Sequence, residues 1–221
     1  MEATPIRLAH VLDSLALAVE LGLGVPAETI QRTAVVAERL ARAAGLGHED
    51  VMATYYIAIL RYVGCTSTSH ETSQAVDELA LGDLLAVTDE EFLPGLERMF
   101  AATMPAAEAR VAALGMAAGF ARPEMAQHHR NHCEAAEMMA KRLDLGSRVV
   151  NGLTHAYERW DGMSTQRLAE GEGLSLPMRV VHVAWLVGQE STNRSAPEIA
   201  QRLRLLSWKA VDPTLAAVPA A

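Results

Sequence analysis

Two histidines in one predicted helix are the first residues whose type and spacing could support chemistry. His129 and His132 share one face of a helix predicted over residues 123–143. Imidazoles are common metal ligands, but a metal site needs three or more donors that converge on one point. His155 and Asp161 are the candidates that would complete such a site. The alternative is that these histidines are hydrogen-bonded residues in the core or at its rim.

Asp161 also opens the longest irregular stretch between two predicted helices. A polar loop with several glycines runs from Asp161-Gly162 to Gly173, and an apolar helix begins near Pro177. Proline suits the first turn of a helix because it has no N–H to leave unpaired. A loop of this length in a compact domain usually has a function of its own. We therefore expect it to bind a ligand or to cap a neighbouring element.

The two cysteines give little support for nucleophilic catalysis. Cys65 is predicted just after a helix C-terminus, where the helix dipole disfavours a thiolate. Cys133 points about 100° away from its neighbour His132 around the helix. No glycine-rich phosphate-binding loop is present. Two cysteines without CxxC spacing predict free thiols in a reducing compartment, so we expect a cytoplasmic protein.

The composition is that of a helical, globular chain. Of the 221 residues, 50% are hydrophobic, 21% are charged and only 5% are aromatic, and Ala, Leu, Glu and Arg dominate. This composition favours helix over strand. The formal net charge of −8 argues against a surface that binds nucleic acid. No run of about 18 apolar residues predicts a membrane span. Since no alternating strand pattern and no internal repeat occurs, we expect an all-α fold.

Glycines and prolines divide the chain into predicted helices. The spacing of apolar residues predicts them at 5–23, 27–44, 49–63, 106–120, 123–143, 177–188 and 195–206. Ser147 is the expected cap of another helix. Thr88 and Glu91 form a capping box for a helix that should start late or kink at Pro94. The apolar 49–63 segment predicts a central helix. We treat residues 1–221 as a single domain with a weakly ordered tail at 213–221.

The first predicted helix is apolar on two sides. One stripe contains Leu8, Val11, Leu12, Leu15, Val19 and Leu23, and the opposite side carries Leu17 and Leu21. A helix of this kind is either buried on both sides or meets a partner subunit. The second interpretation predicts a homodimer.

The residues Glu158-Arg159-Trp160-Asp161-Gly162, with the Leu-Pro-x-Arg helix start at 176–179, resemble the HD-GYP family. Members of that family are helical, metal-dependent phosphohydrolases, and many act on cyclic dinucleotides. The resemblance implies an HD-domain-like multi-helix bundle, with an HD-like half at 1–104 and a GYP-like half at 105–221. The pattern is also similar to degenerate HD-type domains that precede a LuxR-type DNA-binding helix-turn-helix.

Most metal ligands of that family are replaced in this sequence. The resemblance places Arg61 and Tyr62 at the positions of the His-Asp pair, and Thr29 at the position of the preceding histidine. Two adjacent histidines of the family correspond to Ala156 and Tyr157. The hydrolytic centre that the resemblance implies is therefore mostly missing.

Other positions of the family pattern are partly retained. His132 matches a histidine at the start of an HxxxA segment, and Asp161-Gly162 is kept. Cys65 stands at the position of a lysine, and Ser164-Thr165-Gln166 stands at the Gly-Tyr-Pro signature.

Arg61 is the replacement with the largest chemical consequence. A guanidinium stays protonated and cannot be a metal ligand. If it points into the former metal site, it repels a divalent cation, but it can bind a carboxylate or a phosphate bidentately. The alternative is that Arg61 reaches the surface and pairs with an acidic residue.

These residues predict a catalytically inactive regulatory domain for ligand sensing, dimerisation or both, in transcriptional or signalling control. We expect no catalytic residue, no cofactor and no contact with nucleic acid or membrane; the expected partners are a second copy and a small anionic ligand. The pocket candidates are Arg61, Tyr62, His132, Tyr157, Asp161 and Trp185. The alternative is an active phosphohydrolase that holds Fe, Mn or Zn through His129, His132, His155 and Asp161. A third interpretation is a structural interaction domain without a ligand.

Overall fold

The computed structural model of the chain describes residues 7–23, 26–64, 89–120, 123–191 and 194–218. Within these ranges the regular structure is helical, and the only β-type pairing there is an isolated bridge between Ser207 and Val211. The predicted all-α class is therefore confirmed. Cys65, predicted just after a helix end, and Thr88, predicted as part of a capping box, lie outside the described residues.

Three helices form the centre of the bundle. Helices α2 (Thr29–Ala43), α3 (His48–Leu60) and α10 (Leu176–Glu190) pack against one another. The prediction that the apolar third helix is central is confirmed, since Ile57 and Leu60 have no exposed surface. Gly188 of α10 permits the close approach to α2, because a Cβ there would lie 2.6 Å from Thr33 Oγ1.

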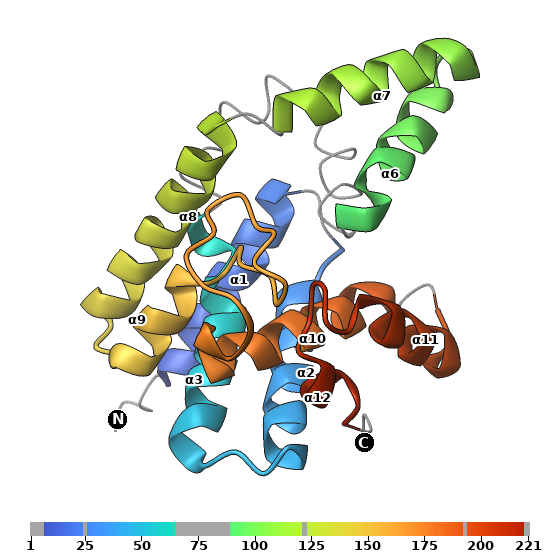
Figure 1. Ribbon diagram of the computed structural model, residues 1–221. Helices are drawn as coiled ribbons and strands as arrows, with labels where there is room; N and C mark the ends of the chain where they lie inside the picture. Colours follow the sequence, from blue (N-terminus) through green and yellow to red (C-terminus); the bar gives the residue numbers. More distant parts are fainter. Residues whose placement is uncertain (1–6, 24–25, 65–88, 121–122, 192–193, 219–221) are drawn as a thin grey trace.

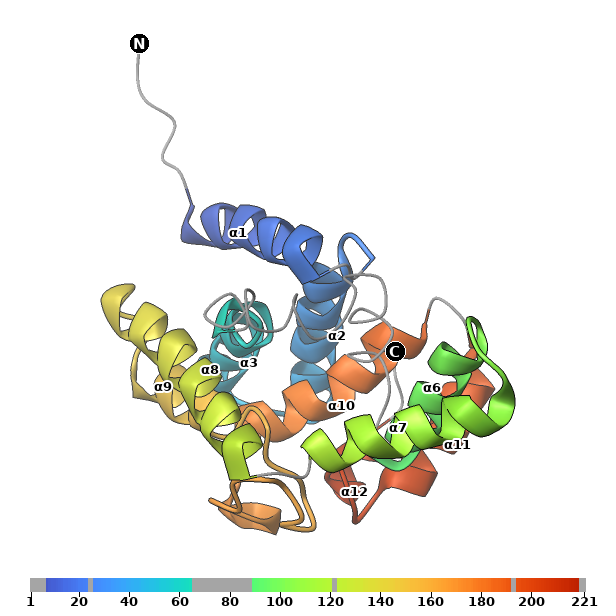
Figure 2. The same ribbon diagram turned by 90° about the horizontal axis from the view of Figure 1, so that it is seen from above.

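Helix α1 (Leu8–Leu23) crosses α2 and α3, as Figure 2 shows from above. Its Glu20 carboxylate is fully buried and accepts hydrogen bonds from the backbone N–H groups of Glu28 and Ile30. These N–H groups belong to the first turn of α2, where no intrahelical acceptor exists. One buried carboxylate of α1 thus caps α2 and fixes the crossing of the two helices.

The buried stripe of α1 differs from the prediction. Leu12, Ala16 and Val19 face the core, whereas Val11 is 51% exposed and belongs to the outer side together with Leu17 and Leu21. Ala16 was not recognised because a small side chain adds little to a hydrophobic pattern. The outer side of α1 therefore exposes three large apolar side chains next to the polar His10 and Ser14, and the homodimer stays a prediction.

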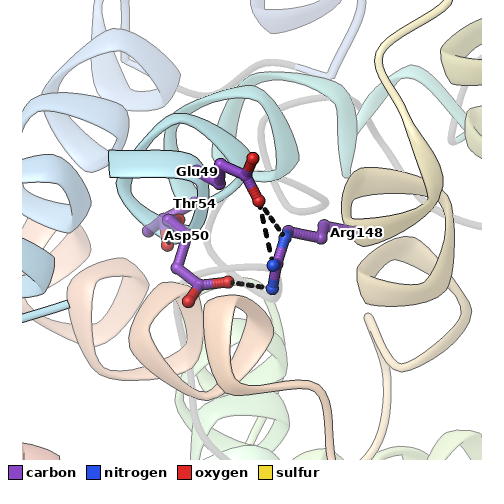
Figure 3. Close-up of polar contacts among 4 residues, drawn as sticks. All are labelled: Glu49, Asp50, Thr54 and Arg148. Atoms are coloured by element: carbon purple, nitrogen blue, oxygen red, sulfur yellow. Dashed lines mark hydrogen bonds and ion pairs between the residues drawn. The ribbon is translucent and has the colours of Figure 1, made fainter. Parts of the chain in front are cut away.

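Helices α8 (Pro123–Arg142) and α9 (Ser147–Thr154) lie side by side along one flank of the bundle (Figure 1). Both contact α3. Ser147 is the first residue of α9 and not its cap; the cap position is Gly146, whose φ is 81°. Arg148 ties α9 to the first turn of α3, where its guanidinium donates to Glu49 and to Asp50 at 2.9 Å each (Figure 3).

Helices α6 (Asp89–Ala101) and α7 (Ala106–Phe120) form a hairpin on the side of the bundle opposite α9 (Figures 1 and 2). They pack around a small cluster of their own that includes Leu96 and Ala113. Pro94 lies inside α6, which starts at Asp89, so the prediction of a late start is wrong. Pro94 is exposed and lies in the second turn of the helix.

The C-terminal segments close the bundle beside α10. A 3-10 turn, η2 (Gly171–Gly173), precedes α10, and α11 (Ala196–Leu206) and α12 (Pro213–Ala216) follow it. The Asp212 carboxylate caps α12 by accepting from the backbone N–H groups of Thr214 and Leu215. Sequence patterns did not reveal α12, which occupies the start of the segment expected to be weakly ordered. None of the described helices is both long enough and apolar enough to cross a membrane.

Candidate functional site

The site begins where α3 ends. Arg61 is the C-terminal cap residue of α3, and its guanidinium carbon lies 5.1 Å from the centre of the Tyr62 ring and 5.2 Å from the centre of the Trp185 ring. Cation–π attraction favours a guanidinium at such distances. Trp185 belongs to α10, so the predicted pocket residues Arg61, Tyr62 and Trp185 are brought together from two central helices.

Several polar atoms around Arg61 are buried without a hydrogen-bonding partner. Among the described residues, nothing accepts a hydrogen bond from Arg61 Nη1 or from Trp185 Nε1, and both atoms are buried. Gln166 comes from the loop between α9 and α10. It lies beside the Cys133 thiol, and so does the Arg61 charge, since both lower the pKa of that thiol.

Other predicted site residues, His129, His132 and Tyr157, form a second group next to Arg61, Tyr62 and Trp185. His132 Nδ1 forms a hydrogen bond of 2.8 Å with the Tyr157 hydroxyl. His129 stacks on the same tyrosine ring, with ring centres 4.0 Å apart and planes at 2°, and its Nδ1 lies 2.7 Å from Thr165 Oγ1. The backbone brings the two groups close, because a Cβ at Gly64 would lie 2.1 Å from the His132 carbonyl oxygen.

The buried imidazoles of the site are neutral at pH 7. Burial lowers the pKa of His132 to about 3, and the neighbouring His128 and His129 lower it further. Burial and the neighbouring His128 likewise lower the pKa of His129 to about 4. His182 of α10 has a pKa of about 3, because it is buried and because Arg61 is nearby. The same burial raises the Cys133 pKa to about 11, so the thiol stays protonated.

His155 and Asp161 form hydrogen bonds with residues other than His129 and His132. The Ser175 backbone N–H donates to His155 Nδ1 at 3.0 Å, which leaves this nitrogen no lone pair for a metal. Asp161 accepts two hydrogen bonds from Arg159, at 3.0 and 2.9 Å, and one from the Met163 N–H. Although burial acts in the opposite direction, these hydrogen bonds hold the Asp161 pKa below its usual value.

The structure therefore does not bring His129, His132, His155 and Asp161 to one point. Within the described ranges, no group of three or more His, Cys, Asp or Glu side chains is arranged to hold a metal ion. The donor set there does not fit the divalent metal that the resemblance implies.

A buried carboxylate anchors the loop that carries Gln166. Glu158 Oε2 accepts from the Ser164 hydroxyl at 2.6 Å and from the Leu168 N–H at 3.2 Å. Ser164 Oγ in turn accepts from the Arg167 N–H at 2.8 Å, which holds Arg167 at a φ of 55°. These contacts fix the backbone of residues 164–168, and the Gln166 side chain lies at the Cys133 thiol.

Two residues of the site were not among the predicted ones. Gln166 was noted only as part of a lost signature, and no periodicity in an irregular loop can place a side chain. His182 was interpreted as a hydrogen-bonded core residue; this is confirmed, since it is buried with Nε2 3.4 Å from the Ala156 carbonyl oxygen. Its proximity to Arg61 required the packing of α10 against α3.

The helical bundle, with its site between the end of α3, α8 and α10, defines an HD-type helical fold. One solved structure with this arrangement is the crystal structure of a cyclic GMP-AMP specific phosphodiesterase of V. cholerae, V-cGAP3. The two superpose with a TM-score of 0.68 over 96% of this chain at 16% sequence identity, and this chain spans 47% of the length of that one. The likeness establishes the fold alone. No protein-family model and no curated protein matches the sequence.

Proposed function

We propose that this chain is a regulatory HD-type domain that has given up metal-dependent hydrolysis. The observation that carries the proposal is Arg61, a permanent cation held between two aromatic rings at the position that the resemblance assigns to the His-Asp pair. The fold is similar to that of a solved phosphodiesterase, and a guanidinium in place of metal-binding side chains supports a different chemistry at its centre.

Electrostatics supports the proposal. A divalent cation about 5 Å from a guanidinium is repelled by about 7 kcal/mol at an effective dielectric constant of about 20. Neutral imidazoles cannot offset this repulsion by charge. Asp161 is the carboxylate of the retained Asp-Gly motif, and it already forms an ion pair with Arg159.

The same electrostatics favours a small anionic ligand as the signal that the domain senses. A ligand that binds only the native fold shifts the population toward it and toward any partner contact that the fold supports. Control of transcription or of signalling through such a contact is part of the proposal.

Homodimerisation is the second part of the proposal. The outer side of α1 exposes Val11, Leu17 and Leu21, which are 51%, 40% and 74% accessible. Light scattering should give twice the chain mass, and the charged variant Leu21→Glu should shift the mass toward that of one chain. If the native protein has the mass of one chain at high concentration, the homodimer proposal is wrong.

Metal content and turnover test the loss of hydrolysis. Protein purified without chelator should contain far less than one Fe, Mn or Zn per chain and should not hydrolyse a phosphodiester when these metals are added. Stoichiometric metal with turnover would overturn the proposal in favour of the rearranged metal site. In that case the metal should disappear in His132→Asn and persist in the control His48→Asn, whose side chain is exposed at the start of α3.

A further inference from the structure

We infer that the turn after α11 carries a docking surface for a segment of another protein that combines apolar and acidic side chains. The surface, which we term the Trp208 surface, consists of the exposed residues Met163, Arg204, Leu205, Trp208 and Lys209. Helix α11 lies at the edge of the bundle away from α9 (Figures 1 and 2). The inference goes beyond the proposed function and does not depend on it, because none of these residues belongs to the site around Arg61.

The first argument is the backbone conformation of Trp208. Its φ is 68°, in the left-handed region that glycine adopts freely and bulky residues rarely adopt. The Trp208 N–H donates to the Val211 carbonyl at 3.2 Å, and the Lys209 N–H donates to the Leu206 carbonyl at 3.1 Å, so hydrogen bonds hold this turn. The Trp208 side chain is nevertheless 71% exposed. Folding stability does not explain a strained residue whose ring stays in solvent, and strain of this kind points to a function of the side chain.

The second argument is the fixed position of the exposed ring. Trp208 meets the Trp160 ring edge-on, with ring centres 6.4 Å apart and planes at 79°. The Arg179 guanidinium lies 5.8 Å from the centre of the Trp160 ring and pairs with the Asp212 carboxylate at 3.0 Å. A tryptophan that is already held in place loses little conformational entropy when a partner binds. Such residues are often the ones that contribute most to the affinity of a protein interface.

The third argument is the apolar surroundings of Trp208. Leu205, in the last turn of α11, is 60% exposed. The Asp161 N–H donates to the Lys209 carbonyl at 2.8 Å, and Met163, two residues after Asp161, is 71% exposed. Two residues span at most about 8 Å, so Met163 lies near the turn. Exposed apolar side chains that occur singly are ordinary, whereas several around one indole indicate an interaction site.

The charge of the surface selects the chemistry of the partner. Arg204 and Lys209 are exposed, and neither forms an ion pair with another described residue. Between Ile199 and Val211 the sequence has no acidic residue, although the net charge of the whole chain is −8. Acidic side chains of a partner would therefore find two cations beside the apolar residues. Complementary charges of this kind accelerate the encounter and fix its orientation.

Two other occupants fit this surface less well. Glu170 and Glu172 are exposed on either side of Gly171, whose N–H donates to the Trp160 carbonyl at 2.8 Å. These carboxylates would repel an anionic membrane surface, whereas a peptide segment can avoid them. A two-fold pairing of the surface with itself would bring the cations of both copies into one interface.

A displayed library of random peptides of about 15 residues, enough for about four helical turns, tests the inference. The library is selected on the native chain at low salt and depleted on the variant Trp208→Gly, since glycine suits a φ of 68°. We expect the remaining peptides to be enriched in Asp and Glu together with large apolar residues. In calorimetric titrations, one such peptide should bind per chain.

Further variants test the roles of charge and of packing. Arg204→Glu combined with Lys209→Glu should weaken peptide binding by about tenfold or more, and high salt should weaken binding to the native chain. Val111→Ala is the matched control: it shortens an equally exposed side chain of α7 and should leave binding unchanged. Trp208→Gly should not lower the urea midpoint, because the relief of backbone strain offsets the lost contact with Trp160.

Several results would overturn the inference. The library could yield no enriched peptide or only basic ones, or binding could survive the charge reversal of Arg204 and Lys209. A clearly lower urea midpoint of Trp208→Gly would mean that the tryptophan serves packing. Binding that depends on Trp208 to vesicles of phosphatidylcholine with phosphatidylglycerol, without peptide binding, would assign the surface to a lipid. A mass in light scattering that halves in Trp208→Gly would assign it to a second copy. Metal content and turnover test the proposed function separately from all of these results.

Discussion

Replacing the buried His182 by leucine should make the stability of this protein less dependent on pH. His182 lies inside α10, is 8% exposed, and contacts the Ala156 carbonyl oxygen through Nε2 at 3.4 Å. Burial first, and the Arg61 charge second, lower its pKa to about 3 in the folded state. In the unfolded chain an imidazole has a pKa of about 6.5. The unfolded state therefore takes up the proton first as the pH falls.

The sign and the size of the effect follow from this difference. Below pH 6.5 the free energy of unfolding decreases as the pH falls, and the decrease continues toward pH 3. Between pH 6 and pH 5, one such imidazole accounts for a loss of about 1.2 kcal/mol. The value is nearly the same for any folded-state pKa below about 4, so it does not depend on the exact shift.

Urea unfolding at pH 6 and at pH 5, followed by circular dichroism, measures the effect. The difference between the two free energies of unfolding should be about 1.2 kcal/mol smaller in His182→Leu than in the native chain. Arg61→Met is the control: it should keep the native difference, since burial alone already holds the pKa low. A native pH dependence in His182→Leu would show that the imidazole gains its proton at an ordinary pKa in the fold, and would refute the reasoning.

Three further substitutions test the packing around the site, each by its urea midpoint and free energy of unfolding. Gly64→Ala should lose about 1–3 kcal/mol, because the new Cβ would lie 2.1 Å from the His132 carbonyl oxygen; an unchanged midpoint would mean that this approach is looser. Asp212→Ala should lose about 3 kcal/mol, since it uncaps α12 and leaves the Arg179 guanidinium without its carboxylate. Arg148→Ala should change the midpoint slightly, and only at low salt, because its ion pairs are exposed; an equal loss in 1 M salt would contradict this.

The central part of the fold could be predicted because it is simple. The apolar residues of α3 recur on all sides, and the breaks at Gly45, Gly47 and Gly146 coincide with helix ends. Such signals are local, so they survive without tertiary information. The HD-type bundle itself followed from the motif resemblance, and the superposition on V-cGAP3 supports that assignment.

The site was predictable only in part. Arg61 and Tyr62 are adjacent in the sequence, and Trp185, which was named as a pocket candidate on its residue type, lies beside Arg61. Asp161 does not join them: it turns to Arg159, two residues earlier, and this local pairing competes with any distant partner. Gln166 was missed because its position depends on the buried Glu158 carboxylate.

At two prolines, Pro94 and Pro213, the helices of the structure differ from those predicted from the sequence. Asp212-Pro213 is a cap followed by a first-turn proline, the signal of a helix, yet the apolar tail after it suggested weak order. Pro94 was expected to delay α6 or to kink it; α6 is not delayed, because a proline in the second turn removes only one hydrogen bond and packing around Leu96 maintains the helix.

The energetics of Arg61 links the fold to the function. Two cation–π contacts contribute about 0.5–1 kcal/mol each, and the position at the C-terminus of α3 contributes about 0.3–1 kcal/mol. Burying a charge that lacks a partner costs several kcal/mol. The favourable contacts do not balance this cost, so Arg61 should destabilise the chain in the absence of an anion. Arg61→Met should therefore unfold at a higher urea concentration than the native chain in anion-free buffer, and phosphate should remove that advantage by stabilising only the native chain. A less stable Arg61→Met, with no differential effect of phosphate, would mean that Arg61 serves packing alone.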